Sequence, residues 1–328
     1  MHQKYCINLI KFIFYSLCLI LLVYPVLILL FFKMPFSMEW VHGAYEKKTK
    51  ACSDIKSSKI IFAGGSSTHF GINAKMVQDA LKMPCVNFGV MALLDLDYII
   101  YKSKQVLKEN DILIMPLEYN LYQFNQKIPY SVQRNYYLLT FDKHFFKAHV
   151  HVFQKIKTIF SIDPLQFISS LYEQIYNRMR FRSMVSNNVG GYSIHTIDQV
   201  NGDEMSVTHK NASLKIDPVI SIDKSLITKD CLKSLNELRK WCKHNNIRLI
   251  LTFPNTAYLK DYERNDYKVA INNLTNKLQE YNFEVLGEPQ DAMVDPKYLY
   301  DTPYHLNTEG TTIRTKKLIS LLEQKLIS

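Results

Sequence analysis

The sequence predicts an α/β fold: a three-layer sandwich with a central parallel sheet, preceded by one transmembrane helix and carrying a mid-chain insertion. Three observations predict it. Continuous apolar runs alternate with helical patterns along the 328-residue chain, which is typical of parallel sheets covered on both faces. An uncharged stretch stands near the N-terminus, and the alternation stops at about 122–226. We therefore expect an N-terminal membrane anchor at 1–33 and an α/β domain at 34–328, with an insertion or cap at about 122–226.

The first expected element is the uncharged stretch at 12–32, FIFYSLCLILLVYPVLILLFF. At 1.5 Å per residue a helix of this length spans a hydrocarbon core of about 30 Å. No small-residue cleavage site follows, which argues against a signal peptide, and buried soluble helices rarely run so long without polar residues. Lys4 and Lys11 precede the stretch, so the positive-inside rule favours a single-pass protein whose α/β domain is extracytoplasmic, on the periplasmic or extracellular face.

The expected strands and helices then follow in alternation. Strands are expected at 59–64, 85–89, 111–118, 247–253 and 283–287, and helices at 73–82, 94–108, 229–245, 266–281 and 309–327. Runs such as DILIMPLE and IRLILTF are apolar throughout, as in strands that are buried on both faces. Open α/β sheets bind ligands at the carboxyl ends of their strands, so we look for functional residues there.

Composition excludes several classes of function. Hydrophobic residues make up 47% and charged residues 21% of the chain, a globular composition. The net charge is +10, but the lysines are scattered and no nucleic-acid-binding signature is present, so anionic lipid headgroups or envelope polymers are more natural partners than nucleic acid. No cofactor or metal is expected. His144, His149 and His151 have no cysteine or carboxylate at metal-ligand spacing beyond Asp142, and they are interpreted as surface histidines.

The cysteines leave two interpretations open. No C-x-x-C pattern occurs among the six cysteines. Four cysteines lie outside the membrane anchor, namely Cys52, Cys85, Cys231 and Cys242. They could form a disulfide, or they could be free or buried thiols.

The strand at 59–64 ends in Gly64-Gly65-Ser66-Ser67, within IIFAGGSSTHFGI. Glycines at the end of a strand allow a sharp turn that lifts the next side chain above the sheet, as in a nucleophile elbow. Two other interpretations are a plain turn and a phosphate cradle at a helix N-terminus. The cradle lacks the lysine of a P-loop and any G-x-G-x-x-G pattern, so it is the weaker of the alternatives.

A second segment, YDTPYHLNTEG at 300–310, supplies a base. Asp301 and His305 stand in this turn-rich segment directly before the last expected helix. A carboxylate near a histidine fixes its tautomer and stabilises its protonated form. On their own, Asp301 could be a turn residue and His305 a solvated loop residue. Together with the serine motif they indicate a Ser-His-Asp site.

This pairing resembles the SGNH (GDSL-like) hydrolase superfamily. Gly64-Gly65-Ser66 would take the place of the G-D-S block, and the segment from Asp301 to Asn307 the place of the D-x-x-H-L-N block. More narrowly, the sequence resembles membrane-anchored envelope members of the superfamily, such as the D-alanine transfer protein of teichoic acid modification and acetyltransferases of exported polysaccharides. The resemblance covers about 59–120 and 229–328. It implies a flavodoxin-like sheet with Ser66, His305 and Asp301 as catalytic residues.

The sequence departs from the family at two points. Gly65 replaces the aspartate of the first block, and Asp301 lies four residues before His305, where three is commoner. The nucleophile also has two candidates. Counting back from Gly71, which in relatives closes the elbow five residues after the nucleophile, selects Ser66. Aligning Gly65-Ser66-Ser67 to the family block selects Ser67, and we favour Ser66.

The resemblance also implies an oxyanion hole. Its expected donors are the Ser66 backbone N–H, Gly89 after the second strand and the Asn120 side chain after the third. Gly89 could instead be a strand-end glycine and Asn120 a turn residue, while Glu118 could support the loop.

The expected function is therefore that of a serine acyltransferase or esterase, acting on acyl groups, in particular acetyl, of an exported envelope polysaccharide. The aromatic, basic stretch at 136–153 favours a polymeric substrate, because aromatic faces stack on sugars. A multispan membrane acyltransferase is a further candidate partner. The alternative is a catalytically inactive scaffold in an envelope acyl-transfer complex.

Overall fold

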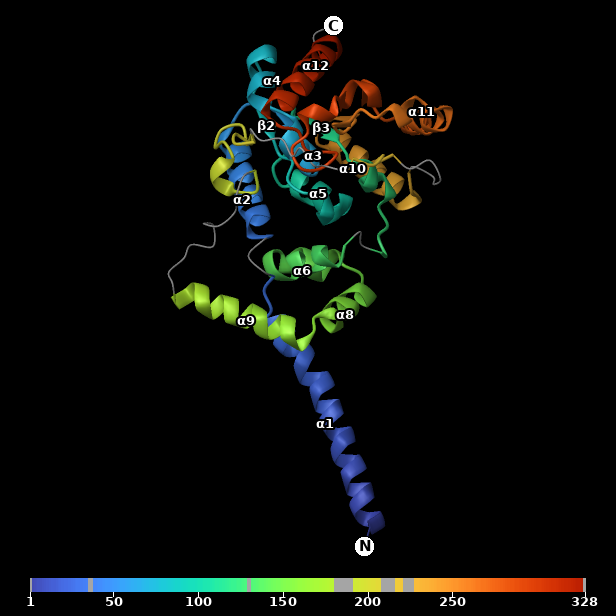
Figure 1. Ribbon diagram of the computed structural model, residues 1–328. Coiled ribbons are helices and arrows are strands. Elements are labelled where there is room, and N and C mark those ends of the chain that lie inside the picture. The colour runs from blue at the N-terminus through green and yellow to red at the C-terminus, as the bar shows by residue number, and fades with distance from the viewer. Residues whose placement is uncertain are drawn as a thin grey trace. The chain divides into compact units, whose positions relative to one another are not determined.

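The computed structural model in Figure 1 describes residues 2–34, 38–128, 131–179, 191–207, 216–220 and 227–326. The chain divides into two compact units. The membrane-helix unit comprises Met1–Met38 and Ser131–Ser186, and the α/β unit comprises Glu39–Tyr130 and Asn187–Ser328. The two units are described separately below.

The α/β unit is built on a five-stranded parallel sheet of order β2-β1-β3-β4-β6. The strands are β1 (Ile60–Phe62), β2 (Cys85–Asn87), β3 (Ile112–Pro116), β4 (Arg248–Thr252) and β6 (Val285–Leu286). All five coincide with strands that the sequence predicts, although each is shorter. The central parallel sheet of the expected fold is thereby confirmed.

Helices cover both faces of this sheet. In Figure 1, α4 (Ala74–Leu81) and α12 (Thr308–Leu326) lie above the strands, and α5 (Asp95–Lys104) and α10 (Lys229–His244) lie below them. Alternate residues along the strands face α4 and α12 and form one apolar core with them, because successive side chains point to opposite faces. Its members include Phe62, Ile114, Ile250, Val77 and Leu318.

The order of the strands determines where a site can form. From β1 the chain crosses to β2 at one edge, and then returns to β3 on the other side of β1. A reversal of this kind opens a crevice at the carboxyl ends of the central strands. The segments that follow β1 and β3 therefore meet at this edge, as do the segments that follow β2 and β4.

Among the remaining elements of the α/β unit, α11 (Asn265–Glu280) was predicted to within one residue at each end, and the others are short or were not predicted. The helix α2 (Glu39–Asp54) was not predicted, and it buries Trp40, Tyr45 and Lys48. The other elements are α3 (Ser66–Gly71), η2 (Ala92–Leu94), η3 (Tyr119–Gln123), η4 (Ile194–Thr196), β5 (Thr256–Ala257), η5 (Lys260–Glu263), η6 (Pro289–Ala292), β7 (Met293–Val294) and η7 (Pro296–Tyr298). Of the two alternatives for the cysteines, the structure shows buried free thiols at Cys52, Cys85, Cys231 and Cys242.

The membrane-helix unit contains α1 and four helices of the predicted insertion. These are α1 (His2–Phe31), α6 (Val132–Phe141), α7 (Lys143–His149), α8 (Val152–Ser161) and α9 (Pro164–Met179). In α1, Ile7–Phe31 is long and apolar enough to cross a membrane. Residues 191–207, also within the predicted insertion, belong to the α/β unit instead. A cap over the sheet remains a prediction.

Candidate active site

The turn after β1 has room only for glycine. A Cβ on Gly65 would lie 2.4 Å from Glu118 Oε1 and 2.5 Å from the Cβ of Ala92, and real Cβ atoms do not approach other atoms so closely. With no side chain at this point, α3 begins directly at Ser66. Both candidate serines therefore lie at the N-terminus of α3, at the carboxyl edge of the sheet.

The two serines differ in their surroundings. Ser67 is fully buried, and its hydroxyl donates to Asn255 Oδ1 at 3.1 Å. Ser66 is half-buried, and no described residue forms a hydrogen bond with its hydroxyl. A hydroxyl that is accessible and unbound can turn toward a substrate, whereas that of Ser67 would first have to give up its partner. The geometry therefore favours Ser66 over Ser67 as the reactive residue.

Asp301 and His305 form the pair that the sequence predicts. Asp301 Oδ1 lies 2.7 Å from His305 Nδ1, and the histidine is almost fully buried. Burial raises the pKa of Asp301, but its hydrogen bonds with His305 and Tyr192 and the charge of His305 outweigh this and lower the pKa below its usual value. Ionised Asp301 accepts the Nδ1 proton of His305. The unprotonated Nε2 is then available as a base.

Tyr192 completes this pair and was not predicted. Its hydroxyl donates to Asp301 Oδ2 and lies 3.1 Å from His305 Nδ1. Burial and the bond to Asp301 raise the pKa of Tyr192, so the phenol stays protonated and remains a donor. Tyr192 comes from the mid-chain insertion, about 110 residues before His305 in sequence, and no spacing pattern connects the two. It binds the second carboxylate oxygen of Asp301, beside the one that contacts His305.

Phe70 joins the pair to the serine helix. Its ring lies 4.4 Å from the His305 ring and 5.4 Å from the Tyr192 ring, measured between centroids. Phe70 follows Ser66 by four residues in α3, so His305 packs against the helix that begins with Ser66. Among the described residues, the structure shows no hydrogen bond between His305 Nε2 and Ser66 or Ser67. The pair and the serine thus belong to one cluster, without a direct bond.

The expected oxyanion donors Gly89 and Asn120 differ in whether the structure places them against the serine helix. Gly89 lies against α3, because a Cβ there would come 2.4 Å from the Cβ of Thr68. Its N–H, however, donates to Asn87 Oδ1 at 3.1 Å. Asn120 lies in η3, half-buried, and no described contact joins it to Ser66. The oxyanion-donor roles of Gly89 and Asn120 therefore remain predictions.

Asn255 is the asparagine that does reach the serine loop. It follows β4, and its Oδ1 accepts from Ser67 while its Nδ2 donates to the backbone oxygen of Tyr304. A Cβ on Gly71 would lie 1.8 Å from Asn255 Oδ1, so the end of α3 also packs directly against it. Asn255 thus links the serine loop to the segment that carries His305. Its position at the carboxyl end of a predicted strand was a signal that could have identified it.

Glu118 supports the turn from beneath. The buried carboxylate accepts from the backbone N–H of Gly65 at 3.1 Å and of Ser67 at 2.8 Å, which confirms that it supports the loop. Burial raises the pKa of Glu118 to about 7, and the N–H groups only partly oppose this. A phosphate would have to displace this carboxylate, so the geometry argues against the phosphate-cradle interpretation. The N–H of Ser66 lies between the two that Glu118 binds.

Replacing Glu118 with glutamine should weaken the loop and change its pH dependence. One end of the amide is a donor and cannot accept, so we expect a loss of about 1–3 kcal/mol in unfolding free energy. In the wild type, the folded protein keeps a proton between pH 4.5 and about 7 that the unfolded chain releases. The stability from this proton is complete below pH 4.5 and is lost as the pH rises through about 7. Urea unfolding of wild type and Glu118→Gln across this range should show the steeper decline in the wild type; parallel declines would contradict the assignment.

A buried cation, Lys48, was also missed. Its ammonium donates to the backbone oxygen of Gly89 at 2.7 Å and contacts His69 Nδ1 at 3.0 Å and Asn87 Oδ1 at 3.4 Å. Three acceptors match the three N–H bonds of an ammonium. Burial lowers the pKa of Lys48 to about 7, although the nearby charges of Asp203 and Glu204 raise it. Lys48 thus ties α2 to α3 and to the loop after β2.

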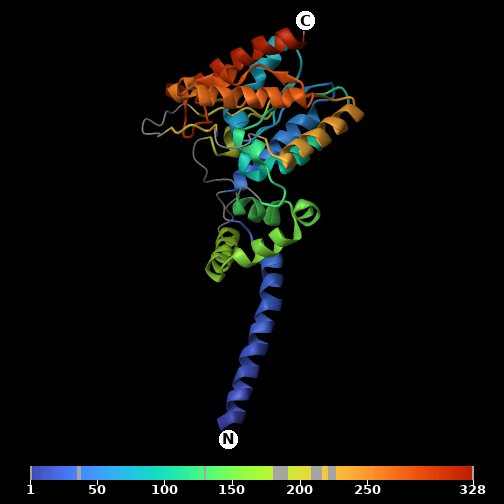
Figure 2. The same cartoon turned by 90° about the vertical axis from the view of Figure 1, so that its right-hand side faces the viewer.

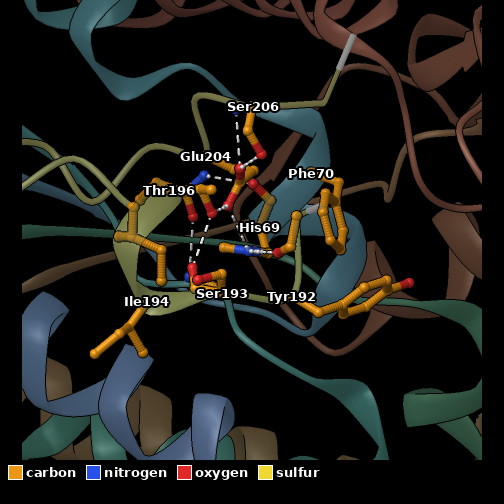
Figure 3. Close-up of polar contacts among 12 residues, drawn as sticks. His69, Phe70, Tyr192, Ser193, Ile194, Thr196, Glu204 and Ser206 are labelled. Atoms are coloured by element: carbon orange, nitrogen blue, oxygen red, sulfur yellow. Dashed lines mark hydrogen bonds and ion pairs between the residues drawn. The ribbon is translucent and has the colours of Figure 1, made fainter. Parts of the chain in front are cut away.

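His69 extends this cluster toward the insertion (Figure 3). Its Nε2 lies 3.4 Å from the backbone oxygen of Gly191 and 3.6 Å from Glu204 Oε2, and Glu204 also accepts from Thr196 and Ser206. Burial and the charge of Lys48 lower the pKa of His69 well below its usual value, so the ring is neutral. The neutral ring accepts from Lys48 at Nδ1 and presents its N–H to Gly191 and Glu204. His69 therefore anchors α3 to the segment that carries Tyr192.

Comparison with models of known protein families finds no match for this chain, and a search among curated proteins finds no significant relative.

Proposed function

We propose that the protein is a membrane-anchored serine acyltransferase or esterase of the SGNH type. The observation that carries the proposal is the 2.7 Å contact between Asp301 and His305. The His305 ring packs against Phe70, which belongs to the helix that begins with Ser66. A half-buried carboxylate bound to a buried histidine, packed against the helix that begins with a half-buried serine at the carboxyl edge of a parallel sheet, supports nucleophilic catalysis.

In the proposed reaction, His305 Nε2 removes the hydroxyl proton of Ser66 as the oxygen attacks an ester or thioester carbonyl. Asp301 stabilises the imidazolium, and the N–H of Ser66, with Gly89 and Asn120, binds the oxyanion. The leaving alcohol or thiol takes the proton from His305, and an acyl-enzyme remains on Ser66. A sugar hydroxyl or water then attacks this ester, with His305 again as the base.

Two adjustments are required when substrate binds. His305 Nε2 must come within hydrogen-bond distance of the Ser66 hydroxyl, and Gly89 must release Asn87 if its N–H is to serve as a donor. Catalytic hydrogen bonds are often long in unliganded sites and tighten in the complex. The half-buried position of Ser66 leaves its hydroxyl free to reorient when substrate binds.

The substrate class follows from the anchor. An α/β unit that follows a membrane helix and faces away from the cytoplasm would meet exported polymers rather than soluble metabolites. We propose acyl groups of an envelope polysaccharide, in particular acetyl, as the transferred groups. A multispan membrane protein that carries the acyl group across the bilayer would supply the donor.

Trapping the acyl-enzyme tests the function directly. The full chain in detergent is mixed with 4-nitrophenyl acetate, quenched rapidly, digested and analysed by tandem mass spectrometry. We expect an acetyl ester on Ser66 and a burst of nitrophenol. The His305→Ala variant is the control and should show neither. A folded wild type that forms no ester and does not react with a fluorophosphonate would favour the inactive scaffold.

A further inference from the structure

Helix α8 of the membrane-helix unit buries its polar side and exposes its apolar side. Thr158 is 2% exposed, and its hydroxyl accepts from Asn135 Nδ2 at 3.0 Å. One turn earlier on the same side, Gln154 is also buried. The opposite side carries Phe153, 74% exposed, and Phe160, 52% exposed, with Ile156 between them. A helix on a water-soluble surface shows the reverse arrangement.

Helix α9 repeats the pattern. Its inner side holds Ser170, whose hydroxyl accepts from the N–H of Lys33 at 3.0 Å and donates to the oxygen of Lys33 at 2.7 Å. The outer side exposes four large apolar residues at helical spacing: Leu165, Ile168, Tyr172 and Ile175. Two successive helices thus expose apolar residues and hold polar ones inside.

Figures 1 and 2 both show α8 and α9 beside the C-terminal part of α1. The Gln174 amide donates to the backbone oxygen of Phe31 at 2.9 Å. The Tyr24 hydroxyl donates at 2.8 Å to the backbone oxygen of Ile162, at the corner between α8 and α9. Tyr24 precedes the end of α1 by seven residues, about 10 Å along a helix axis. The corner is therefore joined to α1 at a level inside its apolar span.

We propose that the α8–α9 pair lies in the plane of the membrane, with its apolar side in the boundary between headgroups and acyl chains. The lipid bilayer that α1 crosses is the occupant of this surface. Exposed apolar patches of this kind mark contacts with proteins or membranes. Lipid is favoured here because the α8–α9 pair is bonded to α1 within the apolar span of that helix. Lys157, on the exposed side of α8, can extend its ammonium to the headgroups.

Introduced tryptophans report the depth of this surface. The full chain is reconstituted into phosphatidylcholine nanodiscs with or without bromine on the upper acyl chains. The variants Phe160→Trp and Ile168→Trp test the two helices. Val269→Trp in α11, where the native side chain is 50% exposed, is the matched control in the α/β unit. The two native tryptophans are common to all samples, and the parent signal is subtracted.

We expect brominated lipid to reduce the added fluorescence of Phe160→Trp and Ile168→Trp at least about twofold, because interfacial helices bury their apolar side by about 5–10 Å. The control should be unaffected. Equal fluorescence in both lipids would show that lipid does not cover the surface, as when a protein partner covers it, and would overturn the proposal. Equal quenching of all three variants would also overturn it, because the chain would then adhere to lipid without specificity. The result does not depend on the acyl-transfer function.

Discussion

Ser66→Ala is expected to abolish labelling by a fluorophosphonate and to lower esterase activity by at least about 10³-fold, the effect of removing a nucleophile that acts as one unit with its base. Its neighbour should behave differently. The Ser67 hydroxyl is buried and donates to Asn255, so Ser67→Ala removes a structural hydrogen bond. This variant should keep its labelling and lose about 1 kcal/mol of stability. Gel fluorescence after labelling, with thermal unfolding of each variant in detergent, provides the two measurements.

The paired variants control for each other, because both remove one hydroxyl from the same turn. A folded Ser67→Ala that is not labelled, beside a Ser66→Ala that is, would reverse the assignment and make Ser67 the nucleophile. Labelling of both single variants but not of the double variant would mean that neither serine is uniquely required. That result would contradict the proposed site while leaving the fold unaffected.

The sheet was predictable because its signal is local. Each strand is a short apolar run between turn residues, and burial on both faces explains why such runs are not interrupted by charges. Both ends of α10 and of α12 lie within one residue of the predicted ends. The helix α2 was missed because it contains few apolar residues. Part of its buried surface is the side chain of Lys48. A lysine in that position normally indicates a solvated surface.

The candidate site was predictable only in part. Asp301 and His305 are four residues apart, so their contact is a local property of one segment. Tyr192, Asn255 and Lys48 reach the site from distant segments, and each is bound to a partner that sequence periodicity cannot identify. Sequence patterns predict which strand ends carry polar residues. They do not predict which of these residues the tertiary fold will pair.

Asp301→Asn should lower esterase activity by about 10²- to 10⁴-fold without unfolding the protein. The physical reason is the tautomer of His305. Asp301 Oδ1 now accepts the Nδ1 proton and leaves Nε2 free to act as a base. Tyr192 donates to Oδ2 and so occupies that oxygen. In asparagine, the oxygen would stay with Tyr192 and the NH₂ group would face Nδ1, which must then accept. The proton moves to Nε2, and His305 can no longer take the proton of Ser66.

The Tyr192→Phe variant separates this explanation from a general loss of packing. It keeps the ring against Phe70 and the carboxylate on His305, and removes only the hydroxyl. We expect it to lower activity by about 10-fold, the equivalent of one hydrogen bond to a charged group. Nitrogen NMR of labelled histidine should report the His305 tautomer directly, with Nδ1 protonated in wild type and Tyr192→Phe and Nε2 protonated in Asp301→Asn. A wild-type tautomer in an inactive Asp301→Asn would show that Asp301 acts on catalysis by some means other than orienting His305.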